Sequence, residues 1–211
     1  MRYKAIIFDL DGVICHTDKY HYMAWRQIAD ELGIYFDQEI NHRLRGVSRM
    51  ESFEIILEQY DGVMNEEKKL QYTAKKNEVY KELLKGMSPE DLAGEVKDTL
   101  HFLREKGLKL AIGSSSKNAK FILSRLGLGD YFDAVSDGNN ITRSKPDPEV
   151  FVKAAQFLGE CAGDCLVVED ARAGLIAAAA GGMECAAVGD AVSCGLATWN
   201  LASFSDLKQI V

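Results

Sequence analysis

Short apolar runs that stop at acidic or hydroxyl-bearing residues recur along the chain and limit the folds open to it. The first run covers residues 4–8 and stops at Asp9, and later runs cover residues 108–112, 165–168 and 185–188. Short runs of this kind are typical of strands buried on both faces of a parallel sheet. Polar residues that follow such strands meet at one edge of the sheet, where ligands of parallel α/β folds bind.

Helical patterns alternate with these runs. Apolar residues recur at helical spacing over residues 95–106, 118–126, 148–158 and 173–180. Asp147 and Pro148 form a good helix start before the third of these segments. Alternation of strands and helices predicts an α/β fold with a Rossmann-like parallel sheet.

A long helical stretch interrupts the alternation after the first strand. Between Asp9 and the return at Ser88 the pattern is helical, and Ser48 with Glu51 forms a capping box there. We therefore predict an inserted α-helical cap over residues 16–88. The catalytic core is then formed by residues 1–15 and 89–211.

Composition narrows the classes of function. The 211 residues are 47% hydrophobic and 27% charged, with a formal net charge of -7. An acidic chain disfavours nonspecific binding to nucleic acid or anionic membranes. The five cysteines fit no zinc spacing, and no secretory signal or apolar span is evident. We expect a cytoplasmic monomer with no nucleic-acid or membrane partner.

The segment Phe8-Asp9-Leu10-Asp11-Gly12 carries the strongest chemical signal. Residues two apart at a strand end point to the same side, so the two carboxylates repel unless a cation or a proton lies between them. A calcium loop is the alternative, but Ile14 and Tyr20 occupy the positions where such a loop needs glycine and a bidentate acid.

Glu169 and Asp170 form a second acidic pair at the end of another predicted strand. Alone the pair is a weak signal, because Asp170 could simply cap the following helix. Together with Asp9 and Asp11 it forms a cluster of carboxylates suited to Mg²⁺, which prefers oxygen ligands and usually serves phosphates.

Two further motifs are typical of anion binding. Residues 114–118 place hydroxyls, a lysine and an amide where a strand becomes a helix, and free backbone N–H groups there favour an anion. Ordinary serine capping is the alternative for this segment. Lys145 precedes Pro146, which favours an extended backbone that would direct the ammonium toward an anion. A solvated lysine in a turn is the alternative there.

Taken in their order along the chain, the four motifs at Asp9, Ser114, Lys145 and Glu169 resemble those of the haloacid dehalogenase superfamily. The resemblance covers the whole chain. The resemblance implies that Asp9 attacks phosphorus to form an aspartyl phosphate, and that Asp11 acts as general acid and base. It implies that Mg²⁺ is held by Asp9, the backbone carbonyl of Asp11 and Asp170, with Glu169 either ligating or orienting.

The resemblance assigns the transferring phosphoryl group to Ser114 and Lys145. The predicted cap also resembles that of sugar-phosphate mutases in the superfamily. The residues that this resemblance assigns to substrate binding are Thr17, His21, Arg45, Gly46, Val47, Arg49, Lys76, Ser115, Ser116, Lys117 and Asn118. Plainer alternatives are packing of His21 beside Trp25 and a solvated Lys76.

The implied reaction interconverts β-D-glucose 1-phosphate and glucose 6-phosphate through β-glucose 1,6-bisphosphate. One phosphate of the bisphosphate would lie at Asp9, and the other among Arg49, Ser116, Lys117 and Asn118. The residues that depart from the superfamily pattern are His16, Arg45, Ala93, Ala171 and Arg172.

Three rival functions stay open. A sugar-phosphate phosphatase would share every core residue. A 2-haloacid dehalogenase needs no magnesium and lacks the second aspartate, so Asp11 opposes it. A catalytically silent binding protein on the same fold is opposed by the intact set of Asp9, Asp11, Lys145 and Asp170.

Overall fold

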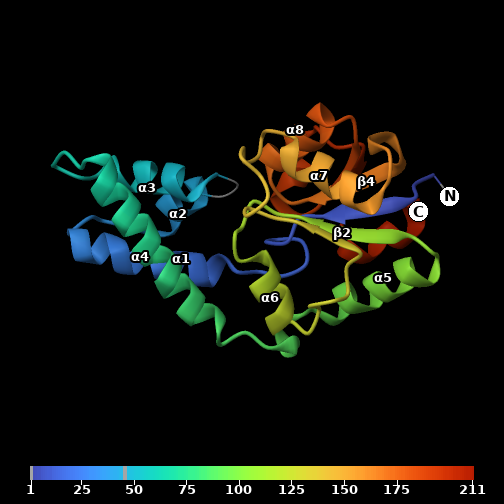
Figure 1. Cartoon of the computed structure of the whole chain (residues 1–211), viewed down its shortest axis with the longest axis horizontal. Coiled ribbons are helices and arrows are strands. Elements are labelled where there is room, and N and C mark those ends of the chain that lie inside the picture. Colours follow the sequence, from blue (N-terminus) through green and yellow to red (C-terminus); the bar gives the residue numbers. More distant parts are fainter. Residues whose placement is uncertain (1, 45–46) are drawn as a thin grey trace. The chain divides into compact units, whose positions relative to one another are not determined.

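The computed structural model describes residues 2–44 and 47–211, which form two compact units (Figure 1). The first unit joins the residues up to His16 with Met87–Val211, and the second is Thr17–Gly86.

The described part of the first unit contains a six-stranded sheet in the order β3-β2-β1-β4-β5-β6, and every pairing is parallel. The strands are β1 (Ala5–Phe8), β2 (Lys109–Gly113), β3 (Ala134–Ser136), β4 (Cys165–Glu169), β5 (Glu184–Ala187) and β6 (Trp199–Asn200). All four residues of β1 and all five of β4 are buried. The predicted Rossmann-like parallel sheet is therefore confirmed.

The sequence patterns did not predict β3 and β6. β3 has three residues and β6 has two. In strands this short, an apolar run cannot be told from a loop by sequence pattern. Both owe their place to pairing with a longer strand, since Ala134 pairs with Ala111 and Trp199 pairs with Ala186.

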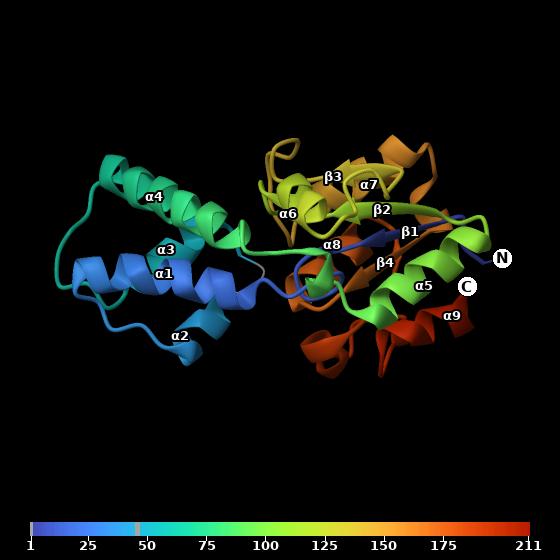
Figure 2. The same ribbon diagram turned by 90° about the horizontal axis from the view of Figure 1, so that it is seen from below.

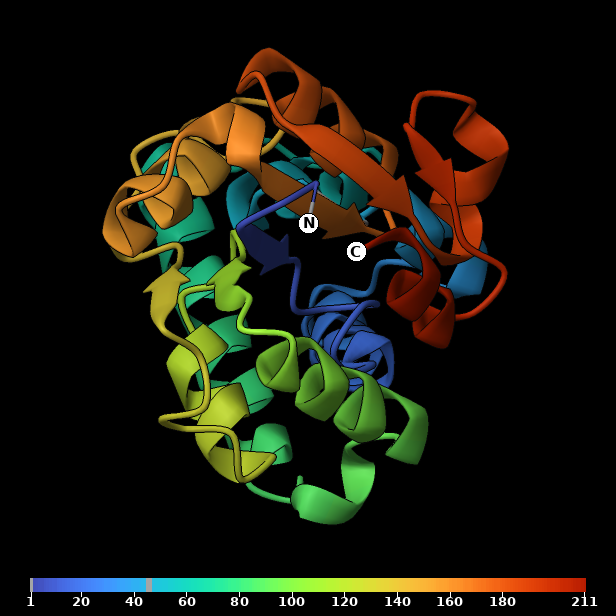
Figure 3. The ribbon, with the colours of Figure 1, turned by 90° about the vertical axis from the view of Figure 1, so that its right-hand side faces the viewer.

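Helices cover both faces of the sheet. They are α5 (Gly94–Glu105), α6 (Ala119–Arg125), α7 (Glu149–Leu158), α8 (Arg172–Ala180) and α9 (Leu207–Ile210), with 3₁₀ turns η1 (Pro89–Asp91), η2 (Ala162–Asp164), η3 (Gly189–Cys194) and η4 (Phe204–Asp206). Figures 1 and 3 show α7 and α8 on the face opposite α5. Asp147 Oδ1 accepts from Glu149 N at 3.0 Å just before α7, but the N-cap position is Pro148, one residue later than the sequence predicts.

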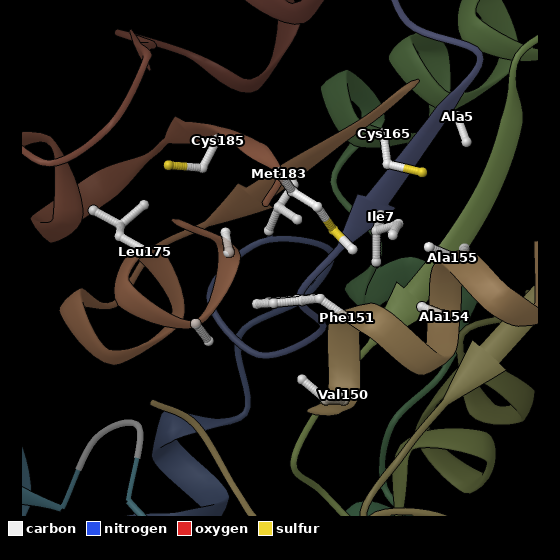
Figure 4. Packing of buried hydrophobic residues seen from close by; sticks show 14 of the residues in the cluster. Ala5, Ile7, Val150, Phe151, Ala154, Ala155, Cys165, Leu175, Met183 and Cys185 are labelled. Atoms are coloured by element: carbon white, nitrogen blue, oxygen red, sulfur yellow. The ribbon is translucent and has the colours of Figure 1, made fainter. Parts of the chain in front are cut away.

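The core beneath α7 and α8 is closely packed (Figure 4). Ile7 of β1, Phe151 of α7 and Leu175 of α8 are each fully buried in one cluster. Burying a side chain of this size contributes about 1.5–3 kcal/mol. Gly113 makes room for this packing, because a Cβ there would lie 2.6 Å from the Phe151 ring. The core thus extends up to the end of β2.

The described part of the second unit is helical. It contains α1 (Asp18–Leu32), α2 (Gln38–Arg43), α3 (Arg49–Leu57) and α4 (Glu66–Leu84), and Figure 2 shows α1 and α4 side by side. Ser48 caps α3 by accepting from Glu51 N at 3.2 Å. Trp25 and Phe53 stack in its core with centroids 5.8 Å apart.

No helix in the described residues is both long and apolar enough to cross a membrane. All five cysteines lie in the described part of the chain and are free thiols. Burial raises the pKa of Cys165 to about 11, so this thiol is a poor nucleophile near neutral pH.

Candidate active site

The register of the sheet brings the predicted acidic residues to one edge. Phe8 of β1 pairs with Ile112 of β2 and with Val168 of β4. Asp9 N donates to Val168 O at 2.9 Å, so the first residue past β1 stays in line with the end of β4. Asp9, Ser114 and Glu169 are therefore delivered by three adjacent strands.

A buried ion cluster joins Asp9, Lys145 and Glu169. Lys145 Nζ donates to Asp9 Oδ1 and, at 2.5 Å, to Glu169 Oε1. The same nitrogen lies 4.6 Å from the centroid of the Phe151 ring. Lys145 is 7% exposed and Glu169 is 1% exposed, which excludes the alternative of a solvated lysine in a turn.

Burial and the charges of neighbouring groups together set the pKa values of Lys145 and Asp9. Burial opposes the charged form of Lys145, but the carboxylates of Asp9 and Glu169 outweigh it and raise the pKa of the lysine. Burial also raises the pKa of Asp9, and the charges of Glu169 and Asp170 add to that rise while Lys145 opposes it. A second cation beside Asp9 would favour the ionised carboxylate that a nucleophile requires.

A tight loop after β1 brings Asp11 and Asp170 close to Asp9. Gly12 N donates to Cys15 O at 2.7 Å, and Gly12 has a φ of 91°, which favours glycine. A Cβ at Gly12 would collide with the Asp170 carboxylate, whose Oδ1 would lie 3.0 Å away. Glycine at this position therefore lets the Asp170 carboxylate pack against the loop.

The donor set fits a magnesium ion held partly by substrate. Within residues 2–44 and 47–211, no three His, Cys, Asp or Glu side chains gather into a metal site by themselves. Mg²⁺ usually takes one or two carboxylates together with waters and phosphate oxygens, so Asp9 and Asp170 suffice on the protein side. Burial is the main cause of the raised pKa of Asp9, and the negative charges of Glu169 and Asp170, which a bound cation would offset, raise it further.

Glu169 is placed to orient a neighbour. Its Oε1 accepts from Lys145, and its Oε2 accepts from Ala171 N at 2.9 Å. Because both oxygens are engaged, the geometry favours the orienting alternative over metal ligation.

The loop after β2 is shaped by its own serines. Ser114 Oγ accepts from Ser116 N at 3.1 Å, and Ser116 Oγ accepts from Asn118 N at 3.2 Å. These are turns within the loop and not the helix capping of the plainer interpretation, because α6 has Asn118 at its N-cap position and no side-chain capping bond there. They leave the anion-binding prediction open, because a hydroxyl oxygen that accepts can still donate its own proton to a phosphate.

A turn that the sequence analysis did not single out supports this loop. Gly138 N donates to Ser116 O at 3.2 Å, and Asn139 Nδ2 donates to Lys117 O at 2.9 Å. A Cβ at Gly138 would lie 2.9 Å from Lys117 N. The run Asp137-Gly138-Asn139 is itself a turn signature that could have revealed this element.

In the second unit, three of the residues assigned to substrate binding, Thr17, His21 and Lys76, lie in one cluster with Trp25 and Tyr80. Lys76 Nζ lies 2.8 Å from His21 Nδ1, and the Tyr80 hydroxyl donates to Thr17 Oγ1 at 3.0 Å. Lys76 also lies 5.0 Å from the Trp25 ring centroid and 4.5 Å from that of Tyr80. At 2% exposed, Lys76 is not on a solvated face.

The imidazole of His21 is neutral in this cluster. Burial lowers the pKa of His21 well below its usual value, and the charges of Lys76 and Arg49 lower it further. An ammonium has only protons to donate, so a charged Lys76 places the imidazole proton on Nε2.

Arg49 lies at the start of α3 and donates to Asn77 Oδ1 at 2.8 Å. Burial lowers the pKa of Arg49 from its usual value. Val47 is half-buried, whereas Arg45 and Gly46 lie outside the described residues.

A parallel α/β sheet that presents a buried aspartate, a buried lysine and further carboxylates at one edge defines an enzyme site built to handle anions. A model of the family described as "haloacid dehalogenase-like hydrolase" matches residues 3–182. The chain belongs to this family, which confirms the resemblance seen in its motifs.

Among its relatives, the β-phosphoglucomutase of Bacillus subtilis is 42% identical over 190 residues, which cover 88% of this chain and 83% of that protein. The crystal structure of β-phosphoglucomutase from Clostridium difficile matches with a TM-score of 0.90 at 36% identity, covering 97% of this chain and 93% of the other. A phosphorylated carbohydrates phosphatase of Thermotoga maritima is 31% identical over 86% of this chain and 82% of its own length.

Proposed function

We propose that this protein is a magnesium-dependent phosphomutase that interconverts β-D-glucose 1-phosphate and glucose 6-phosphate through an aspartyl phosphate and β-glucose 1,6-bisphosphate. The observation that carries the proposal is the buried contact of Lys145 with Asp9 at the end of β1. The choice of substrate rests on the 42% identity to a β-phosphoglucomutase over most of both chains.

Asp9 is the nucleophile in this proposal. Its carboxylate oxygen forms a bond to phosphorus as the bond between phosphorus and the leaving oxygen breaks, and the next acceptor reverses this step. Lys145 compensates the charge on Asp9 and on the phosphoryl oxygens, which is worth most where water is excluded. Ser114, 2% exposed at the end of β2, supplies a hydroxyl proton to the same oxygens.

Bound Mg²⁺ would be held by Asp9, Asp170 and the backbone carbonyl of Asp11, and it supplies positive charge where phosphate and carboxylate meet. Asp11 transfers the proton between the sugar hydroxyl and the leaving oxygen, as general base in one direction and general acid in the other. Glu169 keeps Lys145 oriented through Oε1.

We further propose that Thr17–Gly86 is the cap and binds the rest of the substrate. Arg49 carries the charge for the second phosphate, because a guanidinium grips phosphate oxygens bidentately. Ser115, Ser116, Lys117 and Asn118 are proposed to bind substrate from the core, and Thr17, His21, Arg45, Gly46, Val47 and Lys76 from the cap. A monomeric, cytoplasmic enzyme without nucleic-acid or membrane partners also stays a prediction.

The test is an incubation with β-glucose 1-phosphate, Mg²⁺ and a catalytic amount of β-glucose 1,6-bisphosphate, with glucose 6-phosphate and inorganic phosphate both measured. We expect glucose 6-phosphate to form with little release of inorganic phosphate, and to require the bisphosphate. Steady release of inorganic phosphate without isomerisation would contradict the proposal.

A sugar-phosphate phosphatase is the second candidate. The Thermotoga maritima phosphatase aligns over nearly as much of this chain as the mutase does, so the same core supports either outcome. The two differ in what attacks the phosphorylated Asp9, which is water in a phosphatase and a sugar hydroxyl in a mutase. Release of inorganic phosphate as fast as the sugar monophosphate is consumed would favour the phosphatase.

A further inference from the structure

Gly174 lies in the first turn of α8, where a glycine is unusual because most of the helix is alanine. The helix reads Arg-Ala-Gly-Leu-Ile-Ala-Ala-Ala-Ala, and alanine is the better helix former at an ordinary position. Gly174 is not among the glycines with positive φ, so the backbone conformation does not demand glycine. Some other constraint keeps a side chain out of this position.

The constraint is the carboxylate of Glu169. A Cβ at Gly174 would lie well under 3.0 Å from Oε1, Cδ and Cγ of Glu169. Oε1 is the atom that accepts from Lys145, and Oε2 is held by Ala171 N at 2.9 Å. Glu169 is 1% exposed, so its carboxylate has no solvent-filled space into which it could turn.

We propose that Gly174 is a positioning residue for phosphoryl transfer. It leaves the space in which Glu169 holds Lys145 against Asp9. It acts on the reaction only through Glu169 and Lys145. This inference rests on the proposed function, because it assigns Lys145 to the transferring phosphoryl group. A methyl group at this position moves the Glu169 carboxylate and releases Lys145 from one of its two anchors.

A double-mutant cycle tests the proposal. The variants are Gly174→Ala, Glu169→Ala and the two combined, with Gly163→Ala as matched control because a Cβ there meets nothing within 4 Å. We measure kcat and KM for hydrolysis of p-nitrophenyl phosphate and for the sugar-phosphate reaction, together with the melting temperature of each variant.

We expect Gly174→Ala to lower kcat by roughly tenfold or more, with the same division between kcat and KM as Glu169→Ala. The double variant should be within about twofold of Glu169→Ala, because the atoms that the methyl group strikes are then gone. Gly163→Ala should match the wild type. The proposal would be overturned if the reductions in kcat of the two single variants multiplied in the double variant. A fully active Gly174→Ala variant would also overturn it.

Melting temperatures make the collision measurable without any activity. Gly174→Ala should melt below the wild type, whereas in the Glu169→Ala background the same change should cause no further loss. If Gly174→Ala fails to fold while the double variant folds, the collision with Glu169 is supported. If both fail to fold although Glu169→Ala alone folds, the methyl group strikes something else and the inference fails. A wild-type protein that transfers no phosphoryl group contradicts the proposed function, while the melting cycle still decides the role of Gly174.

Discussion

The two units each bury a lysine, and they hold it in different ways. Lys145 in the sheet unit contacts two carboxylates, Asp9 and Glu169. Lys76 in the helical unit contacts a neutral imidazole and the faces of two aromatic rings. In the first arrangement two carboxylates stabilise the charged ammonium, whereas the second surrounds the ammonium with an imidazole and two aromatic rings. Under the proposed function, this difference assigns Lys145 to charge balance at the reacting phosphoryl group and Lys76 to substrate recognition.

Removing the nucleophile should have the largest effect. Asp9→Asn keeps the size of the side chain but not the carboxylate that attacks phosphorus, and we expect turnover to fall by at least about 10⁴-fold. The measurement is turnover of β-glucose 1-phosphate by a variant whose circular dichroism and melting curve show that it is folded. Retention of full activity would refute the nucleophile assignment.

Replacing each buried lysine by methionine tests the difference between the two units. Lys145→Met should lower kcat by about 10²–10³-fold with sugar phosphates and with p-nitrophenyl phosphate alike, because the phosphoryl group is common to both. It should also destabilise the fold by about 3–5 kcal/mol, since Asp9 and Glu169 stay buried without their cation.

Lys76→Met should lower kcat/KM for the sugar phosphate alone, by roughly tenfold for one lost charge-assisted contact. Both variants are assayed on both substrates, and urea unfolding gives the stability. Equal losses on p-nitrophenyl phosphate from the two variants would break the distinction between a catalytic lysine and a recognition lysine.

Arg49→Ala tests the same distinction, with a loss smaller than the one expected for Lys145→Met. We expect kcat/KM for the sugar phosphate to fall by about tenfold to a hundredfold, which is the range for losing a charged hydrogen-bond partner, while p-nitrophenyl phosphate hydrolysis stays within about twofold. The assay compares the two substrates with the same enzyme stock. Parallel losses on both would count against a distal-phosphate role.

The smallest expected effect concerns His21 and stability. The folded state holds this imidazole neutral, whereas the unfolded chain protonates it near its usual pKa of about 6.5. Stability therefore falls as pH drops below about 6.5, by up to about 1.4 kcal/mol per pH unit until the folded-state pKa is reached.

Urea unfolding between pH 7.5 and 5.0 measures this slope, and His21→Asn is the control. The pH dependence of the wild type should exceed that of the variant. Identical slopes in the two proteins would show that His21 is not kept neutral by the fold.

One physical reason lets the sequence predict both the sheet and the candidate active-site residues at the ends of its strands. Buried parallel strands need continuous apolar runs, so Asp9, Ser114 and Glu169 stand out where those runs stop. Lys145 follows no strand directly, and it was identified by its place before Pro146 together with the order of the motifs.

Other features depend on contacts that a linear pattern does not contain. Strand β3 forms because β2 offers it a partner. The burial of Lys76 depends on which face of α4 meets α1, and a long amphipathic lysine fits a solvated face as well as a packed one. The role of Gly174 depends on the direction of the Glu169 side chain, which becomes visible only in three dimensions.

The central claim is that Asp9 carries the phosphoryl group between two sugar oxygens. The most direct measurement is mass spectrometry of the protein quenched during turnover with β-glucose 1,6-bisphosphate, followed by mapping of the modified peptide. We predict one added phosphoryl group, located on Asp9 and absent from the Asp9→Asn variant. A phosphoryl group on another residue, or its persistence in that variant, would contradict the account.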